Sequence, residues 1–146
     1  MTLKNTDKTN AVFTIKNNQT FKGDKELIEI VTEGNFYKKN DTFFLMYKEY
    51  TDLGTVSVLI KAADDAVSVK RSGVCRTRME YRENSCQEIL YTLPFGETIM
   101  NLETLKVKNS LNLSGGSIEL EYKLTINQED YYNDMVIQVS VTDRHS

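Results

Sequence analysis

Two charged side chains fall on otherwise apolar faces of expected β-strands, which makes them the first candidates for chemistry in this chain. Glu49 lies on the apolar face of a strand expected at 43–50, and Arg71 on that of a strand expected at 66–71. A carboxylate and a guanidinium on inward faces are costly unless they are paired, so we expect them to meet, directly or through water. Three interpretations stay open: Arg71 binds an anionic group of a ligand, the two form a structural ion pair, or Arg71 extends to solvent at the turn before Gly73.

Tyrosine is abundant, with eight copies. Each offers a large apolar body and one hydroxyl that needs a partner when buried. Four of them occupy apolar or mixed faces of expected strands: Tyr47, Tyr81, Tyr91 and Tyr122. Such residues either form a barrel core with hydroxyls at the rims or line a pocket for an amphipathic ligand. The candidate ligand-binding residues are Tyr47, Glu49, Arg71 and Tyr122.

A short basic segment, KRSGVCRTRMEYR at 70–82, holds four of the five arginines. Alternation places Arg76, Arg78 and Arg82 on the face opposite Tyr81. We expect this basic stripe to point outward, either as a solvated charge row that protects a sheet edge or as a surface for an acidic partner. Nucleic acid is disfavoured because no aromatic residue interleaves with the arginines to stack on bases.

Few residues are available for other catalytic chemistry. The single histidine, His145, lies next to the C-terminus, which disfavours nucleophile–histidine pairs and multi-histidine metal sites. Cys75 and Cys86 cannot form a zinc site alone. If the turn centres on 83–84, Cys86 faces Tyr81 rather than Cys75, and we expect two reduced thiols. We therefore expect no catalytic residue, no metal and no cofactor, and we keep a cofactor-free enzyme as a third alternative.

The elements that position these residues are β-strands, because the dominant period of the apolar residues is two. Strands are expected at 11–17, 26–33, 43–50, 55–62, 66–71, 74–81, 86–93, 117–127 and 134–142. At 99–107 we predict a bulged strand with Ile99, Leu105 and Val107 on its apolar face, and a short helix is the alternative. Short turn signals such as Ser114-Gly115-Gly116 separate the strands.

These strands predict an all-β fold. About nine strands in one sheet would curl, and closure removes exposed edges. We predict one domain at 11–142, a single antiparallel meander barrel of eight to ten strands. Residues 1–10 are expected to be a flexible N-terminus, and residues 143–146 a C-terminal tail.

Composition agrees with one globular domain: 146 residues, 40% apolar and 27% charged. The net charge of −3 is too mild to argue for nucleic acid or a membrane surface. No apolar run is long enough to span a bilayer. Residues 1–10 lack the apolar region of a secretory signal. We expect a cytoplasmic protein with no membrane partner.

The order of several motifs resembles the YwiB family of small bacterial proteins of unknown function. The resemblance covers residues 25–142 and rests on TEGNFYKKNDTFFLMYKEYTDLGTV, KRSGV, YTLPFGE and GGSIELEYKLTINQEDYYNDMVIQV. It implies a calycin-like β-barrel, related in shape to lipocalins, and a bacterial cytoplasmic source. It implies no activity. Lipocalins usually carry a Gly-x-Trp element near their first strand, and this chain has no Trp, so their ligand binding is not carried over.

The leading expectation is an intracellular β-barrel that binds a small amphipathic or anionic ligand in its lumen. The alternative is a protein-interaction or assembly module with a packed lumen, acting through its outer face and able to form a homodimer. A connected interior cavity of some hundreds of cubic ångströms would favour the first.

Overall fold

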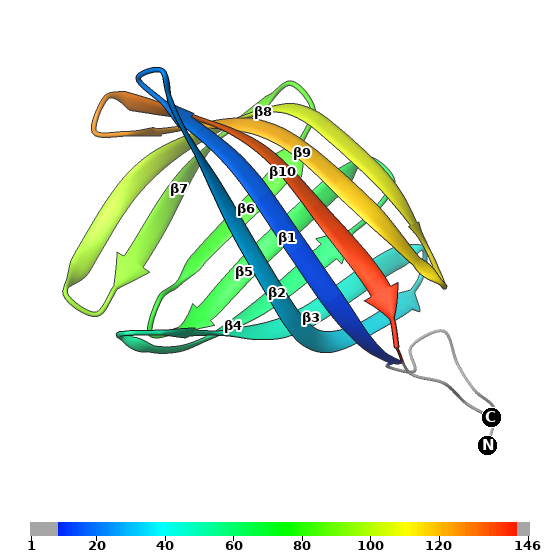
Figure 1. Cartoon of the computed structure of the whole chain (residues 1–146). Helices are drawn as coiled ribbons and strands as arrows, with labels where there is room; N and C mark the ends of the chain where they lie inside the picture. Colours follow the sequence, from blue (N-terminus) through cyan, green and yellow to red (C-terminus); the bar gives the residue numbers. More distant parts are fainter. Residues whose placement is uncertain (1–8, 143–146) are drawn as a thin grey trace.

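The computed structural model describes residues 9–142, and its regular structure is entirely β (Figure 1). The strands are β1 Thr9–Phe21, β2 Asp24–Lys39, β3 Thr42–Thr51, β4 Gly54–Ala62, β5 Ala66–Gly73, β6 Thr77–Arg82, β7 Ser85–Leu93, β8 Gly96–Asn112, β9 Gly115–Ile126 and β10 Glu129–Val141. The predicted all-β meander is confirmed, with ten strands. The first strand begins two residues earlier than predicted. The remainder of the expected loose ends, 1–8 and 143–146, lies outside the described residues.

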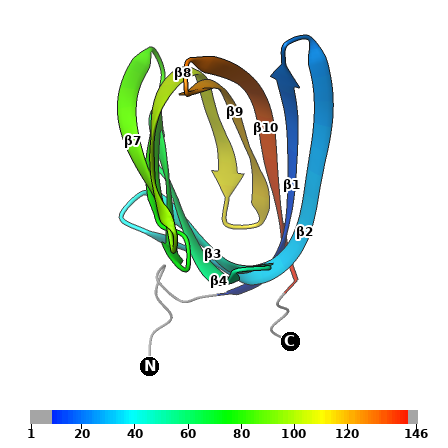
Figure 2. The ribbon, with the colours of Figure 1, turned by 90° about the vertical axis from the view of Figure 1, so that its left-hand side faces the viewer.

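The strands form one antiparallel sheet that curls into a nearly closed barrel. Their order across the sheet is β6-β5-β4-β3-β2-β1-β10-β9-β8-β7. The first and last strands pair in the middle of the sheet, which leaves β6 and β7 as its two edges. Figure 2 looks into one end of the barrel, with β7 at the left and β1 and β2 at the right. In residues 9–142 there is no helix long and apolar enough to cross a membrane.

The two edges meet at a seam. The turn lies at 83–84, but the cross-strand position of Cys86 opposite Tyr81 that was predicted from it is wrong, because β6 and β7 do not pair as a regular hairpin. β6 and β7 are consecutive in sequence, yet they are joined by an isolated bridge between Arg76 and Thr92 and by a bond from Glu80 N–H to Gln87 Oε1 (2.9 Å). Cys86 does not face Tyr81; it pairs with Glu103 on β8. The turn directs the chain toward β8 because Asn84 N–H donates to the carbonyl oxygen of Thr104 (2.9 Å), the residue that pairs with Ser85.

The inner face of the barrel follows the expected period of two in most strands. The bulge predicted in β8 is confirmed, since its register with β9 shifts between Thr104 and Lys106. The side chains assigned to its apolar face were partly wrong. Met100, Leu102 and Thr104 are buried, whereas Ile99 and Leu105 are 59% and 49% exposed. The extra residue at the bulge reverses the alternation, so even positions point inward before it and odd positions after it.

β2 bends at Gly34, and this bend gives the barrel its wide mouth. The strand pairs with β1 from Asp24 to Phe36, but it pairs with β3 only from Asn35 onward. A Cβ atom at Gly34 would overlap the carbonyl oxygen of Met46 and lie 2.7 Å from Cε2 of Phe13. Glycine therefore lets β3 cross closely under β2 before the two strands diverge.

Replacing this glycine should destabilise the barrel. We expect Gly34→Ala to lower the free energy of unfolding by about 1–3 kcal/mol, because the new methyl group overpacks a backbone contact. Urea denaturation measures the change. Glu33→Ala, at the exposed neighbouring position, is the control and should change stability by less than about 0.5 kcal/mol. Equal stability of Gly34→Ala and wild type would contradict the role given to the bend.

Candidate functional site

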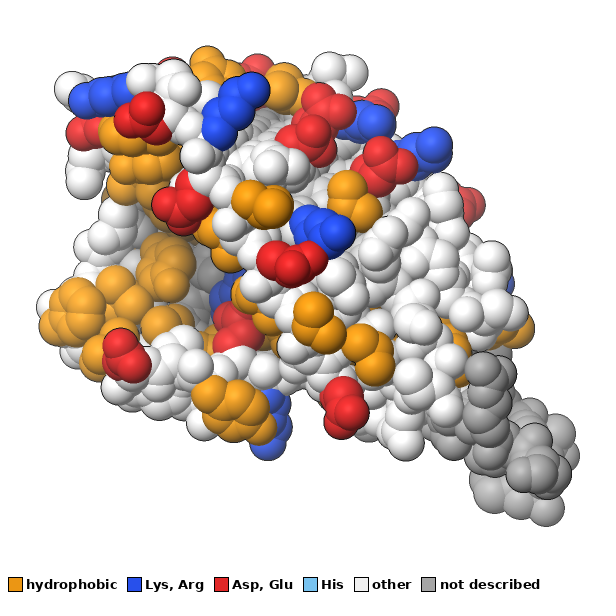
Figure 3. Space-filling model, in the orientation of Figure 1, with side chains coloured by type: hydrophobic (Ala, Val, Ile, Leu, Met, Phe, Trp, Pro, Cys, Tyr) orange, Lys and Arg blue, Asp and Glu red, His pale blue; other side chains and the backbone are white. Residues whose placement is uncertain are grey.

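The lumen of the barrel holds a cavity of about 240 Å³. Its wall is largely apolar, with Ile15, Ile60 and Ile137 contributed by β1, β4 and β10. Six polar side chains interrupt that wall: Asn17, Tyr47, Glu49, Arg71, Tyr81 and Tyr122. Figure 3 shows a hollow on the left of the molecule, with acidic and basic side chains visible inside it. The lumen is therefore not fully packed, and the polar groups are concentrated where the space is.

Glu49 and Arg71 meet in this cavity, as their positions on inward faces predicted. Arg71 Nε donates to Glu49 Oε1 at 3.2 Å, and the two side chains are 27% and 21% exposed. They come from β3 and β5, which are separated by β4. Tyr47 and Arg71 both face Val58, so Arg71 reaches Glu49 diagonally across β4. This contact pairs the half-buried carboxylate, and the guanidinium, which also bonds the Tyr47 hydroxyl, keeps further N–H donors for other acceptors.

Burial sets the protonation of the polar cluster. Desolvation is the largest influence on Arg71 and opposes its charge, but Glu49, Tyr47 and Tyr81 together outweigh it, and the pKa of Arg71 lies above its ordinary value. Burial raises the pKa of Tyr47 to about 12. Burial also raises the pKa of Tyr81 and that of Tyr122. At neutral pH the lumen thus presents one fixed cation and three neutral phenols.

All four candidate residues chosen from the sequence line the same cavity. The rings of Tyr81 and Tyr122 pack at 4.8 Å between centroids, and Tyr47 packs against Phe13 at 5.8 Å. Tyr81 also lines the cavity, although it was not among the candidates. The signal for Tyr81 was its position two residues after Met79, on the same face of the strand; both residues are buried.

The sequence reasoning missed Asn17, a buried amide on β1. Asn133 Nδ2 donates to the Tyr131 carbonyl oxygen at 3.1 Å, which fixes the orientation of that amide. Its Oδ1 then accepts from Asn17 Nδ2 and Gln19 Nε2, both at 3.0 Å. Asn17 Oδ1 is left without a partner in a residue that is 8% exposed. The alternation Ala11, Phe13, Ile15, Asn17 on one face could have revealed it.

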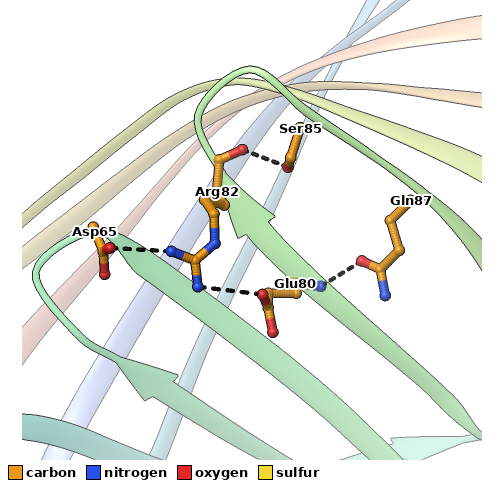
Figure 4. A network of polar contacts seen from close by, with 5 residues as sticks. All are labelled: Asp65, Glu80, Arg82, Ser85 and Gln87. Atoms are coloured by element: carbon orange, nitrogen blue, oxygen red, sulfur yellow. Dashed lines mark hydrogen bonds and ion pairs between the residues drawn. The ribbon is translucent and has the colours of Figure 1, made fainter.

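The basic stripe points outward, away from the lumen. Arg76, Arg78 and Arg82 are all exposed. Arg82 is already neutralised, since its guanidinium lies 3.0 Å from Asp65 and 3.5 Å from Glu80 (Figure 4). The structure therefore separates Arg82 from the other two arginines of the stripe.

Cys75 is buried and Cys86 is exposed, and both are free. In the described part of the chain, no group of three or more His, Cys, Asp or Glu side chains could hold a metal ion. Arg71, Glu49 and the phenols of the lumen offer hydrogen bonds and charge to a molecule in the cavity.

Comparisons with known proteins find the same barrel. A family model described as a domain of unknown function (DUF1934) matches residues 13–138. The uncharacterized β-barrel protein YwiB of Bacillus subtilis (strain 168) is 28% identical over 116 residues, which cover 79% of this chain and 82% of that protein. The crystal structure of ywiB protein from Bacillus subtilis matches with a TM-score of 0.87 at 25% identity, covering 92% of this chain and 93% of that one. These descriptions give a fold and no activity.

The raised pKa of Tyr47 should appear as alkaline destabilisation. Above pH 10 this tyrosine ionises in the unfolded chain, while in the folded protein it stays protonated up to about pH 12. Stability is therefore lost as the pH rises through this window. We expect wild type to lose about 2 kcal/mol more than Tyr47→Phe between pH 9 and 11.5, measured by urea denaturation. Tyr50→Phe, at an 80% exposed position of the same strand, should follow wild type. Parallel profiles of wild type and Tyr47→Phe would contradict the burial of this hydroxyl.

Proposed function

We propose that this chain, which belongs to the DUF1934 family of domains of unknown function, is a binding protein for a small amphipathic carboxylate held in the barrel lumen. One observation carries the proposal: a cationic guanidinium, with donors to spare beyond Glu49, faces a cavity of about 240 Å³. A purely structural ion pair would not require this space beside it. The two free thiols agree with a reducing, cytoplasmic setting, which we propose with it.

The polarity of the cavity supports an acceptor-rich head group. Arg71 and the neutral hydroxyls of Tyr47 and Tyr122 can all donate hydrogen bonds. Charge-assisted bonds from a guanidinium to a carboxylate are among the strongest available to a protein. A carboxylate would share Arg71 with Glu49, and a hydroxyl or amine elsewhere on the ligand could donate to the unpartnered Asn17 Oδ1.

The size and the walls of the cavity limit the remainder of the ligand. The volume of about 240 Å³ lies below the range of roughly 300–1,000 Å³ for pockets that hold drug-sized molecules. It corresponds to about eight water molecules, which suits a ligand of about ten non-hydrogen atoms. Ile28 and Ile30 line the same cavity from β2 and offer apolar contact. A long acyl chain would exceed this space.

Isothermal titration calorimetry with benzoate tests this function, with benzamide as the neutral isostere. We expect benzoate to bind at least about tenfold more tightly than benzamide, a difference of about 1.4 kcal/mol. Glu49→Gln/Arg71→Gln removes both charges together, so neither is left buried and alone, and it should abolish the preference for benzoate. Arg82→Gln, on the outer face, should retain it. Equal binding of the two probes, no binding of either, or an unchanged preference in the double variant would contradict the proposal.

A second candidate function, self-association, is favoured by the free edge of β2. Residues 24–33 pair with β1 only, because pairing with β3 begins at Asn35. Leu27 and Val31 on this segment are 60% and 64% exposed. An unpaired strand edge with apolar side chains is a template for another strand.

The occupant that fits this edge is the β2 strand of a second copy. Antiparallel pairing about Glu29 would set Leu27 opposite Val31 and Lys25 opposite Glu33, so that apolar and opposite-charged residues meet. Glu29 would face Glu29 of the second copy. Lys16 lies 3.5 Å from this carboxylate and offsets the repulsion between the two glutamates.

Analytical ultracentrifugation over a concentration series tests the second function. We expect wild type to dimerise, and Val31→Lys to weaken the dimer at least tenfold because it places cations in the apolar pairing. Leu113→Lys, at a 67% exposed apolar position in the β8–β9 hairpin, should dimerise like wild type. A wild-type monomer at all concentrations, or equal effects of the two substitutions, would rule out pairing through β2.

A further inference from the structure

The seam between β6 and β7 carries a groove on its outer side that the lumen does not explain. Its volume is about 450 Å³, and its rim includes Lys70, Arg76 and Arg78. Thr92 and Leu90 contribute the opposite wall from β7. Between the Arg76–Thr92 bridge and the Glu80–Gln87 hydrogen bond, β6 and β7 have no backbone pairing. The groove therefore lies along a gap in the sheet and not on a flat face.

Four cations line this groove. Arg71 is paired with Glu49, whereas Lys70, Arg76 and Arg78 have no acidic partner among residues 9–142. Several other cations of the outer face lie beside carboxylates, as Lys16 does with Glu29 and Lys123 with Glu103, at 3.5 and 3.3 Å. Arg82, next along β6, is held by Asp65 and Glu80. Glu97 lies on the far side of β7, where Thr92 Oγ1 donates to it at 3.5 Å. The positive charge of the groove is therefore concentrated and uncompensated, in a protein of net charge −3.

Two of these cations directly oppose each other. Lys70 on β5 is the cross-strand partner of Arg78 on β6, and like charges in this arrangement destabilise a sheet. The other like-charged pair on the outer face, Glu121 and Asp134, differs because Lys106 lies 3.6 Å from Glu121. At the seam the repulsion remains unless an anion from outside relieves it.

We propose that this seam groove is an oxyanion site that binds the phosphoryl group of a small organic phosphate. A phosphate dianion offers three acceptor oxygens, which match two planar guanidinium groups and one ammonium group. Leu90 and its cross-strand neighbour Ile99 are 51% and 59% exposed, and they form an apolar platform beside the cations. This platform favours a phosphate monoester with an organic substituent over inorganic phosphate. The site goes beyond the proposed lumen function: Arg71 borders both the groove and the lumen cavity, but Lys70, Arg76 and Arg78, which carry the proposal, line the groove alone.

Titration of phenyl phosphate at constant ionic strength, followed by calorimetry, tests the site. We expect phenyl phosphate to bind more tightly than inorganic phosphate, and Arg76→Gln/Arg78→Gln to weaken its binding at least tenfold. Lys39→Gln removes one charge at the end of β2 and should bind like wild type. Benzoate binding in the lumen should persist in the double arginine variant, so the two sites can fail separately.

A second variant provides a readout that a solvated charge row would not give. Arg78→Glu turns the repulsive pair with Lys70 into an attractive one, so we expect a higher melting temperature than wild type together with loss of phenyl phosphate binding. The melting temperature of wild type should be higher in phenyl phosphate than in chloride at equal ionic strength, whereas that of Arg78→Glu should be the same in both.

Vesicle sedimentation distinguishes a soluble organic phosphate from a lipid head group as the ligand of the groove. Binding of phenyl phosphate without binding to phosphatidic acid vesicles identifies a soluble phosphate. Binding to those vesicles and not to phosphatidylcholine vesicles identifies a lipid head group, since phosphatidic acid presents the same phosphate monoester to the groove. No binding of phenyl phosphate or of vesicles, or equal weakening by Lys39→Gln and the double arginine variant, would overturn the proposal.

Discussion

The two-residue period of an antiparallel sheet decides which side chains point into the lumen. Ten strands curl around one axis, and each strand sends alternate residues inward. Pairing of β1 with β10 puts the first and last strands side by side, so neighbouring strands are paired over at least part of their length everywhere except at the β6–β7 seam. The regular sheet has two local exceptions. The bulge in β8 changes which of its residues point inward, and the bend at Gly34 separates β2 from β3 at the mouth.

Within that frame, the lumen keeps polar groups that a packed core would exclude. Arg71 and Glu49 offset each other's charge at 3.2 Å, and the surrounding phenols remain neutral because burial raises their pKa values. Burying such an ion pair commonly stabilises a protein less than well-packed apolar residues would. The arrangement therefore has a cost in stability, and the ligand binding that we propose would account for it.

Much of this barrel could be predicted from the sequence, because alternation is a local property. The faces of β3, β4 and β9 and the meeting of Glu49 with Arg71 all follow from it. What could not be predicted depends on contacts between distant residues. The turn after β6 is directed to β8 by Thr104, Arg82 is neutralised by Asp65, and Asn17 is oriented by Asn133. No local pattern identifies those partners. For the same reason Ile99 and Leu105 could not be assigned to a face before the position of the bulge was known.

Native mass spectrometry of the protein purified gently from its own cells would show directly whether the lumen carries a ligand, because it detects the mass of a bound molecule. We expect one small carboxylate per chain, of about ten non-hydrogen atoms, which is absent when the Glu49→Gln/Arg71→Gln variant is purified in the same way. A chain that carries no additional mass, or a bound molecule that the double variant retains, would contradict it.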